Sequence, residues 1–125
     1  MYIHIGYIKH GQHPMAITSA QFHILLTLAE GERHGYAIMQ EVHRRTDGAV
    51  ELGPGTLYRS IKQLLDRGFI EEMPLDDRDE PGARKMRRSY ALTAEGKTRT
   101  LEEARRLQDL MEWAETALVM GERRR

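Results

Sequence analysis

Cysteine is absent from this 125-residue chain. Its absence excludes disulfide bridges, zinc sites built on thiolates and a thiol nucleophile, and it is typical of proteins in a reducing cytosol. No apolar run approaches the ~18 residues that a membrane span requires, and the N-terminus lacks the pattern of a secretory signal. We therefore expect a cytoplasmic protein.

An excess of either charge is also lacking, because 19 basic residues balance 19 acidic ones. Any affinity for nucleic acid must therefore come from basic residues gathered on one face. The HExxH, GxSxG, P-loop and paired-carboxylate motifs of common enzymes are missing as well. We expect one domain with an appendage, no enzymatic activity and no cofactor.

Residues 1–16 are predicted to be an N-terminal extension. Strand-like apolar residues alternate there with histidines and glycines, the apolar ones being Tyr2, Ile3, Ile5, Tyr7 and Ile8. The segment is interpreted as an extension outside the native fold with Met15 as the natural start, as a short strand, or as an arm that packs on a partner subunit. A metal site at His4, His10 and His13 has weak support, because their spacing fits no helical pair and no carboxylate joins them; we expect no metal.

Two helices are predicted at the start of the next segment, residues 17–92. The first follows Ser19 as N-cap and ends at Gly31, with an apolar face of Phe22, Leu25, Leu26, Leu28 and Ala29. The second spans residues 34–45 and ends in a turn at Asp47 and Gly48. A brief strand is expected at residues 50–52.

A third helix opens at Pro54, where the missing N–H of proline costs nothing. Its buried stripe is formed by Leu57, Ile61, Leu64 and Leu65, and it ends before Gly68. Residues 69–73 and 87–92 are strand-like and enclose a polar stretch, which predicts a hairpin with a long tip.

A long final helix is predicted from Ala94 to Val119, with Thr93 as its N-cap and Glu95 in its first turn. It defines a C-terminal dimerisation helix over residues 93–121, followed by a basic tail at residues 122–125. Its ~39 Å exceed what a small domain needs for its own core. The apolar seam predicted to meet a second copy consists of Leu101, Ala104, Leu107, Leu110, Met111, Ala114 and Leu118.

This order of elements predicts a mainly α, α+β fold, the winged helix-turn-helix, whose third helix enters the DNA major groove. On that helix Arg59 can bond guanine, Gln63 can read adenine and Lys62 can neutralise phosphate. These side chains are alternatively the solvated face of an ordinary amphipathic helix, but the basic block in the hairpin favours DNA. The residues predicted to bind DNA are Gly55, Thr56, Tyr58, Arg59, Lys62, Gln63, Arg84, Lys85, Arg87 and Arg88.

Acidic residues at the other side of the hairpin tip oppose this interpretation unless they point away from DNA or pair with Arg78 and Arg84. They are Asp76, Asp77, Asp79 and Glu80. The single tryptophan, Trp113, lies at the edge of the final helix's seam. It is interpreted as an anchor at the rim of a dimer interface, or as a stacking partner for a planar effector.

Four motifs together resemble the PadR-like transcriptional regulators. They are His-Gly-Tyr at 34–36, Gly-Thr-Leu-Tyr-Arg at 55–59, Arg-Gly-Phe-Ile at 67–70 and Arg-Ser-Tyr-Ala-Leu-Thr-Ala-Glu-Gly at 88–96. The resemblance spans residues 17–96 and implies a homodimeric repressor on a palindromic operator, with a recognition helix at residues 55–67. It also implies release by a small, often phenolic, effector in some members.

The chain departs from the family pattern in two places. The tip at residues 75–86 is longer and more acidic than a typical tip of this family, and residues before Met15 have no counterpart. The predicted function is a sequence-specific DNA-binding transcriptional regulator acting as a homodimer. The alternative is a winged helix used only for protein–protein assembly, because the fold is reused in that way.

Overall fold

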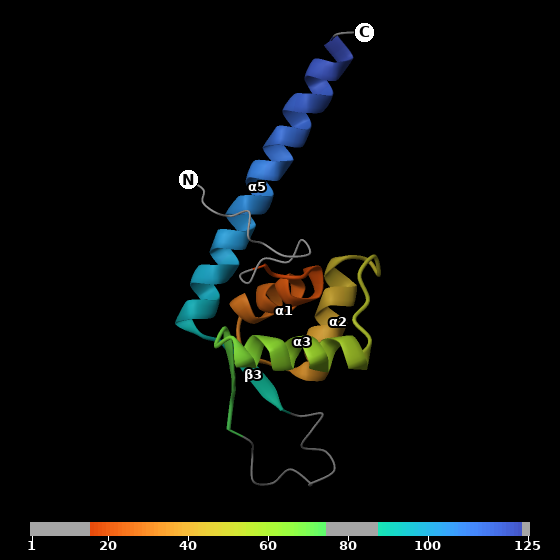
Figure 1. Cartoon of the computed structure of the whole chain (residues 1–125). Helices are drawn as coiled ribbons and strands as arrows, with labels where there is room; N and C mark the ends of the chain where they lie inside the picture. Colours follow the sequence, from red (N-terminus) through yellow and green to blue (C-terminus); the bar gives the residue numbers. More distant parts are fainter. Residues whose placement is uncertain (1–15, 75–87, 124–125) are drawn as a thin grey trace.

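The computed structural model of the chain describes residues 16–74 and 88–123. Within these two ranges, three short helices and three short strands precede one long helix, and Figure 1 shows this helix extending far beyond the other elements. The elements are α1 (Ser19–Ala29), β1 (Arg33–His34), α2 (Gly35–Arg45), α3 (Pro54–Asp66), β2 (Ile70–Glu72), β3 (Ser89–Leu92) and α5 (Ala94–Arg123). The predicted winged helix-turn-helix with a long C-terminal helix is confirmed.

Helix α1 begins with a capping box. Thr18 Oγ1 accepts a hydrogen bond from the backbone N–H of Gln21 at 3.1 Å, and Gln21 Oε1 accepts one from the backbone N–H of Thr18 at 3.0 Å. Each side chain satisfies a backbone donor that the helix leaves without a partner. The N-cap is therefore Thr18, and the prediction of Ser19 was wrong by one residue.

The buried face of α1 also differs in part from the prediction. Leu25 and Leu28 are buried as expected, and Ile24 is fully buried beside them. Leu26 is 42% exposed and Ala29 is exposed as well. Apolar residues lie on neighbouring sides of α1, so their spacing alone could not predict which side packs against the core.

The first strand lies at β1 rather than at residues 50–52, where the structure has no strand. A strand needs a neighbour to hydrogen-bond with, and β1 finds β3, pairing Arg33 with Tyr90 and His34 with Ser89. Leu52 instead turns into the core and is 8% exposed. The sheet has the order β1-β3-β2 with antiparallel pairing throughout, so β3 is its central strand.

The wing hairpin pairs Ile70 with Leu92 and Glu72 with Tyr90. Both predicted strands are confirmed in place, although each is shorter than expected. The predicted wing residues Arg84, Lys85 and Arg87, the acidic residues of the tip, the first fifteen residues and the last two lie outside the described residues.

One apolar core joins all three short helices to the sheet. Its members are Ile24, Leu25, Leu28, Ile38, Val42, Leu52, Leu57, Ile61, Leu64, Phe69, Ile70 and Tyr90. Such burial contributes about 25 cal/mol per Å² of apolar surface removed from water. The buried side of α3 thus fixes the helix in the domain, and the opposite side is left exposed.

Helix α5 is anchored at its start. Thr93 Oγ1 accepts a hydrogen bond from the backbone N–H of Gly96 at 3.0 Å, which confirms the predicted cap. A Cβ placed on Gly96 would lie 1.9 Å from the carbonyl oxygen of Phe69, so only glycine permits this close approach. Within residues 16–74 and 88–123, no helix is long and apolar enough to span a membrane.

Candidate nucleic-acid interface

The candidate interface is the polar side of α3. Leu57, Ile61 and Leu64 fix the opposite side of the helix in the core, with exposed fractions of 0, 2 and 0%. The polar stripe at intervals of four, three and four residues consists of Gly55, Arg59, Lys62 and Asp66, and all four are exposed. The described part of the chain therefore leaves this side of α3 uncovered.

Arg59 and Lys62 are the cations of this stripe. Arg59 forms no ion pair with any other residue that the structure describes. Lys62 Nζ lies 3.3 Å from Asp66 Oδ2, with both side chains largely exposed. An exposed pair of this kind contributes little free energy, so Lys62 can exchange Asp66 for a phosphate at small cost.

Tyr58, one of the predicted DNA contacts, packs against α2. A Cβ placed on Gly35 would lie 2.9 Å from Tyr58 Oη, so the absence of a side chain at Gly35 makes room for the ring. Tyr58 is half-buried beside the core. Its position gives it a role in holding α2 against α3, and only its outer part is left for another molecule.

Gln63 is held toward α1. Gln21 Nε2 donates a hydrogen bond to Gln63 Oε1 at 2.9 Å, and Gln21 is itself buried in the capping box of α1. The two glutamines are 42 residues apart in the sequence. One lone pair of the Gln63 carbonyl is thus already used within the protein, so a bidentate adenine contact would need its amide N–H to donate to N7 and its remaining lone pair to accept from N6–H.

The wing contributes one described cation, Arg88, immediately before β3. Arg88 Nε lies 3.7 Å from Glu72 Oε2, and both side chains are partly exposed. Beside them Tyr90 is buried, and burial raises the pKa of its phenol, with the negative charge of Glu72 adding to the effect. Arg88 is therefore partly neutralised by its neighbour on β2.

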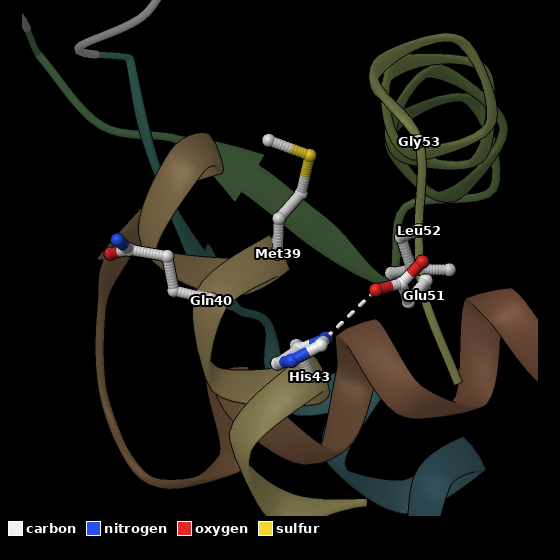
Figure 2. Close-up of a pocket in the computed structure, with 6 residues that line it drawn as sticks. All are labelled: Met39, Gln40, His43, Glu51, Leu52 and Gly53. Carbon is white, nitrogen blue, oxygen red and sulfur yellow. Dashed lines mark ion pairs between the residues drawn. The ribbon is translucent and has the colours of Figure 1, made fainter. Parts of the chain in front are cut away.

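A groove of about 490 Å³ runs between α2 and the segment that leads into α3. Figure 2 shows His43 on α2 next to Glu51, whereas the side chain of Gln40 on the same helix points away from Glu51, and Gly53 lies at the start of α3. His43 Nδ1 lies 3.1 Å from Glu51 Oε1. The floor includes the apolar side chains of Met39 and Leu52.

Gln40 and His43 were not among the residues predicted to bind DNA, although a signal for them existed in the sequence. With Tyr36 they stand four and three residues apart, on the side of α2 away from the buried Ile38 and Val42. All three are exposed. In a helix-turn-helix the helix before the recognition helix crosses the DNA backbone, so these residues extend the candidate interface.

The seam predicted for dimerisation is uncovered in a single chain. Leu107, Met111 and Leu118 are 38, 57 and 70% exposed, and every residue from Arg105 to Gly121 is exposed. Of the other predicted seam residues, Leu101, Leu110 and Ala114 are exposed and Ala104 is half-buried. The seam continues the side of α5 on which Thr100 and Glu103 are buried.

Comparison with known proteins relates this chain to transcriptional regulators. The family model of the transcriptional regulator PadR-like family matches residues 24–102, which include α3, the wing strands and the start of α5. A protein of uncharacterised function from Lysinibacillus sphaericus is 33% identical over 97 residues, which cover 78% of this chain and 80% of that protein.

Several solved structures have a fold similar to that of this chain. A PadR family transcription regulator from Clostridium difficile superposes with a TM-score of 0.68 at 22% identity, covering 81% of this chain and 99% of that one. A transcriptional regulator from Clostridium thermocellum gives 0.65 at 23% identity, with coverage of 77 and 89%. RosR from H. salinarum gives 0.59 at 28% identity, with coverage of 82 and 91%.

Proposed function

Because the chain belongs to the PadR-like family of transcriptional regulators, which are DNA-binding proteins and not enzymes, we propose that it is a repressor that binds a palindromic operator as a homodimer. The observation that carries this proposal is the exposed polar side of α3. Arg59 and Lys62 stand there on a helix whose other side is fixed in the core. The sequence of the operator is read by this side of α3, one copy in each half-site.

Each protein group has a distinct role in this proposal. Arg59 bonds a base edge, because a guanidinium matches the two acceptors of guanine in the major groove. Lys62, released from Asp66, contacts phosphate, as do Gln40 and His43 beside the start of α3. The basic residues of the wing, Arg88 among them, hold the flanking backbone.

The homodimer is supported by the overhanging part of α5. The whole of α5 has 30 residues and spans ~45 Å, and the apolar seam on its second half is exposed, covered by no other residue that the structure describes. Pairing two such helices buries the seam and sets the two α3 helices at a fixed distance. Two recognition helices about 34 Å apart face the same side of a DNA duplex.

Arg59→Ala is the most specific test of the proposed recognition helix α3. We expect binding to the operator, taken from DNA upstream of the protein's own coding region, to weaken by ~1 to 3 kcal/mol, with a smaller loss on unrelated DNA. The matched control is Arg105→Ala, which removes an exposed arginine from α5. Equal affinities for the two variants on the operator would contradict the role given to Arg59.

The proposal also includes release of the protein from DNA by a small aromatic effector. Trp113 is 70% exposed in the single chain, and its ring offers a stacking surface on the helix that sets the spacing of the dimer. A ligand there shifts the dimer toward a spacing that misses the groove repeat. Quenching of Trp113 fluorescence by phenolic compounds, together with loss of operator binding, is the expected result; no response to such compounds would contradict it.

A further inference from the structure

The second half of α5 is apolar over an unusually wide arc. At 3.6 residues per turn, eight of the nine apolar residues between positions 107 and 120 cover about half of the circumference, and the ninth, Val119, lies on the opposite side. In order around the helix the eight are Met120, Trp113, Ala117, Leu110, Ala114, Leu107, Leu118 and Met111, and all are exposed. A helix that packs on one neighbour needs an apolar stripe only slightly wider than about 100°.

This arc contains two seams. The first, with Leu107, Met111, Ala114 and Leu118, is the one assigned to the dimer. The second, which we name the outer edge, shares Leu110 with the predicted dimer seam and continues through Trp113, Ala117 and Met120, at intervals of three, four and three residues. Trp113 is 70% exposed and Met120 is 48% exposed, so a dimer through the first seam leaves a large apolar surface in need of a second neighbour.

The N-terminal segment matches the outer edge in composition. Residues 1–14 contain Tyr2, Ile3, Ile5, Tyr7 and Ile8 together with Lys9 and three histidines, and they contain no acidic residue. Residues 107–121 contain Asp109, Glu112 and Glu115 and no lysine or arginine. An apolar segment with positive charge therefore has an apolar helix with negative charge as its complement.

The segment also joins the described chain at a suitable place. Arg67 Nη1 donates a hydrogen bond to the carbonyl oxygen of Ala16 at 2.8 Å. Helix α1, which begins three residues after Ala16, packs against α5, and the pKa of Arg67 is lowered by burial and further by the charge of Arg99 in the second turn of α5. Trp113 is 14 residues further along the helix, or ~21 Å. Fifteen extended residues reach up to ~50 Å, which is more than enough.

We propose that residues 1–14 bind along the outer edge of α5 in their own subunit, with their isoleucines and tyrosines covering Trp113 and Met120. The arm and the dimer seam together bury the apolar arc. A planar effector that stacks on Trp113 then competes with this arm. The proposal does not depend on DNA binding, so it can fail while the proposed function stands.

Trp113 reports on the arm directly because it is the chain's only tryptophan. In the full chain we expect weak quenching of its fluorescence by acrylamide. A variant lacking residues 2–14 should show a quenching constant several-fold higher and an emission maximum shifted to the red. Addition of a synthetic peptide of residues 1–14 should reverse part of both changes.

Two full-length variants guard against indirect effects of the deletion. The substitutions Ile3→Ser, Ile5→Ser and Tyr7→Ser should raise the quenching constant almost as much as the deletion. The matched control carries Gln12→Ser in the same segment, which alters neither its apolar nor its basic residues, and should leave the quenching constant unchanged. Equal quenching in the wild type, the deletion and the first triple variant overturns the proposal.

The subunit that supplies the arm is tested in a monomeric background. Met111→Glu with Leu118→Glu places charges in the dimer seam without touching the outer edge. If the arm covers Trp113 of its own subunit, the tryptophan stays protected in this double variant and becomes accessible only when residues 2–14 are also removed. Loss of protection on dissociation alone means that a partner subunit covers Trp113, and it overturns the proposal.

Discussion

The two halves of α5 have the same apolar side but different surroundings. In the first half Gly96, Thr100 and Glu103 are buried against the domain, whereas from Arg105 onward every described side chain up to Gly121 is exposed. In Figure 1 the second half stands clear of the other helices and strands. The contacts of α5 with the core of its own domain thus end about one third of the way along the helix. The apolar residues beyond that point are suited to pack against something outside this domain.

The largest effect is expected at Gly96. Gly96→Ala forces a methyl group to 1.9 Å from the carbonyl oxygen of Phe69, so the helix or the wing must move. We expect a loss of about 3 kcal/mol in the free energy of unfolding, at the upper end of what overpacking costs. Urea unfolding monitored by circular dichroism measures this loss.

Gly121→Ala is the control in the other half of the same helix, because a Cβ there meets no atom within 4 Å. It should leave stability unchanged or raise it by up to ~1 kcal/mol, since alanine favours a helix more than glycine does. Similar losses for the two variants would contradict the contrast between the halves.

In the second half the expected effect falls on dimerisation and not on the folding of the domain. Met111→Glu with Leu118→Glu should dissociate the dimer while the domain stays folded, because burying each carboxylate costs at least about 2 kcal/mol. Sedimentation velocity at fixed protein concentration measures the change. Thr116→Glu, on the opposite side of the helix, should leave the dimer intact; a folded dimer in the double variant would contradict the assigned seam.

A smaller effect is expected from Glu103 in the first half. Arg106 donates hydrogen bonds to Glu103, and these lower the pKa of the buried carboxyl below its ordinary value, with Arg99 lowering it further. Because the pKa is lowered in the folded state, the stabilisation is complete above the unfolded pKa of about 4.3 and fades as the pH falls through the folded pKa.

Glu103→Gln should therefore cost about 1 kcal/mol at neutral pH and almost nothing in strong acid. Unfolding in urea across this pH range measures the difference. Glu115→Gln, an exposed carboxylate in the second half, is the control and should behave as the wild type at every pH. A constant difference between Glu103→Gln and the wild type across the range would exclude the ion pair as its cause.

Local signals predicted much of this molecule. Proline at the first position of α3 and glycine after its end, with φ of +77° at Gly68, mark that helix in the sequence itself. The cap at Thr93 and the long seam on α5 follow from spacing in the same way. Each of these signals depends on residues only a few positions apart, and the structure confirms the helices α3 and α5 that the signals predicted.

Long-range pairing accounts for what the sequence did not reveal. Strand β1 has only two residues and forms because β3, more than 50 residues later, lies beside it. The bond between Gln21 and Gln63 and the packing of Tyr58 on Gly35 likewise join separate helices. These contacts determine how two predicted DNA-binding side chains are placed, which no periodicity within α3 could indicate.

The most direct test of the DNA-binding face is a salt titration. Binding of the wild-type protein to duplex DNA from upstream of its coding region is measured between about 50 and about 200 mM salt. If the dimer neutralises ~6 to 10 phosphates, affinity should fall by ~10³ to 10⁵ over this range. An affinity that stays constant across the range would contradict the assignment of the exposed side of α3 to a DNA duplex.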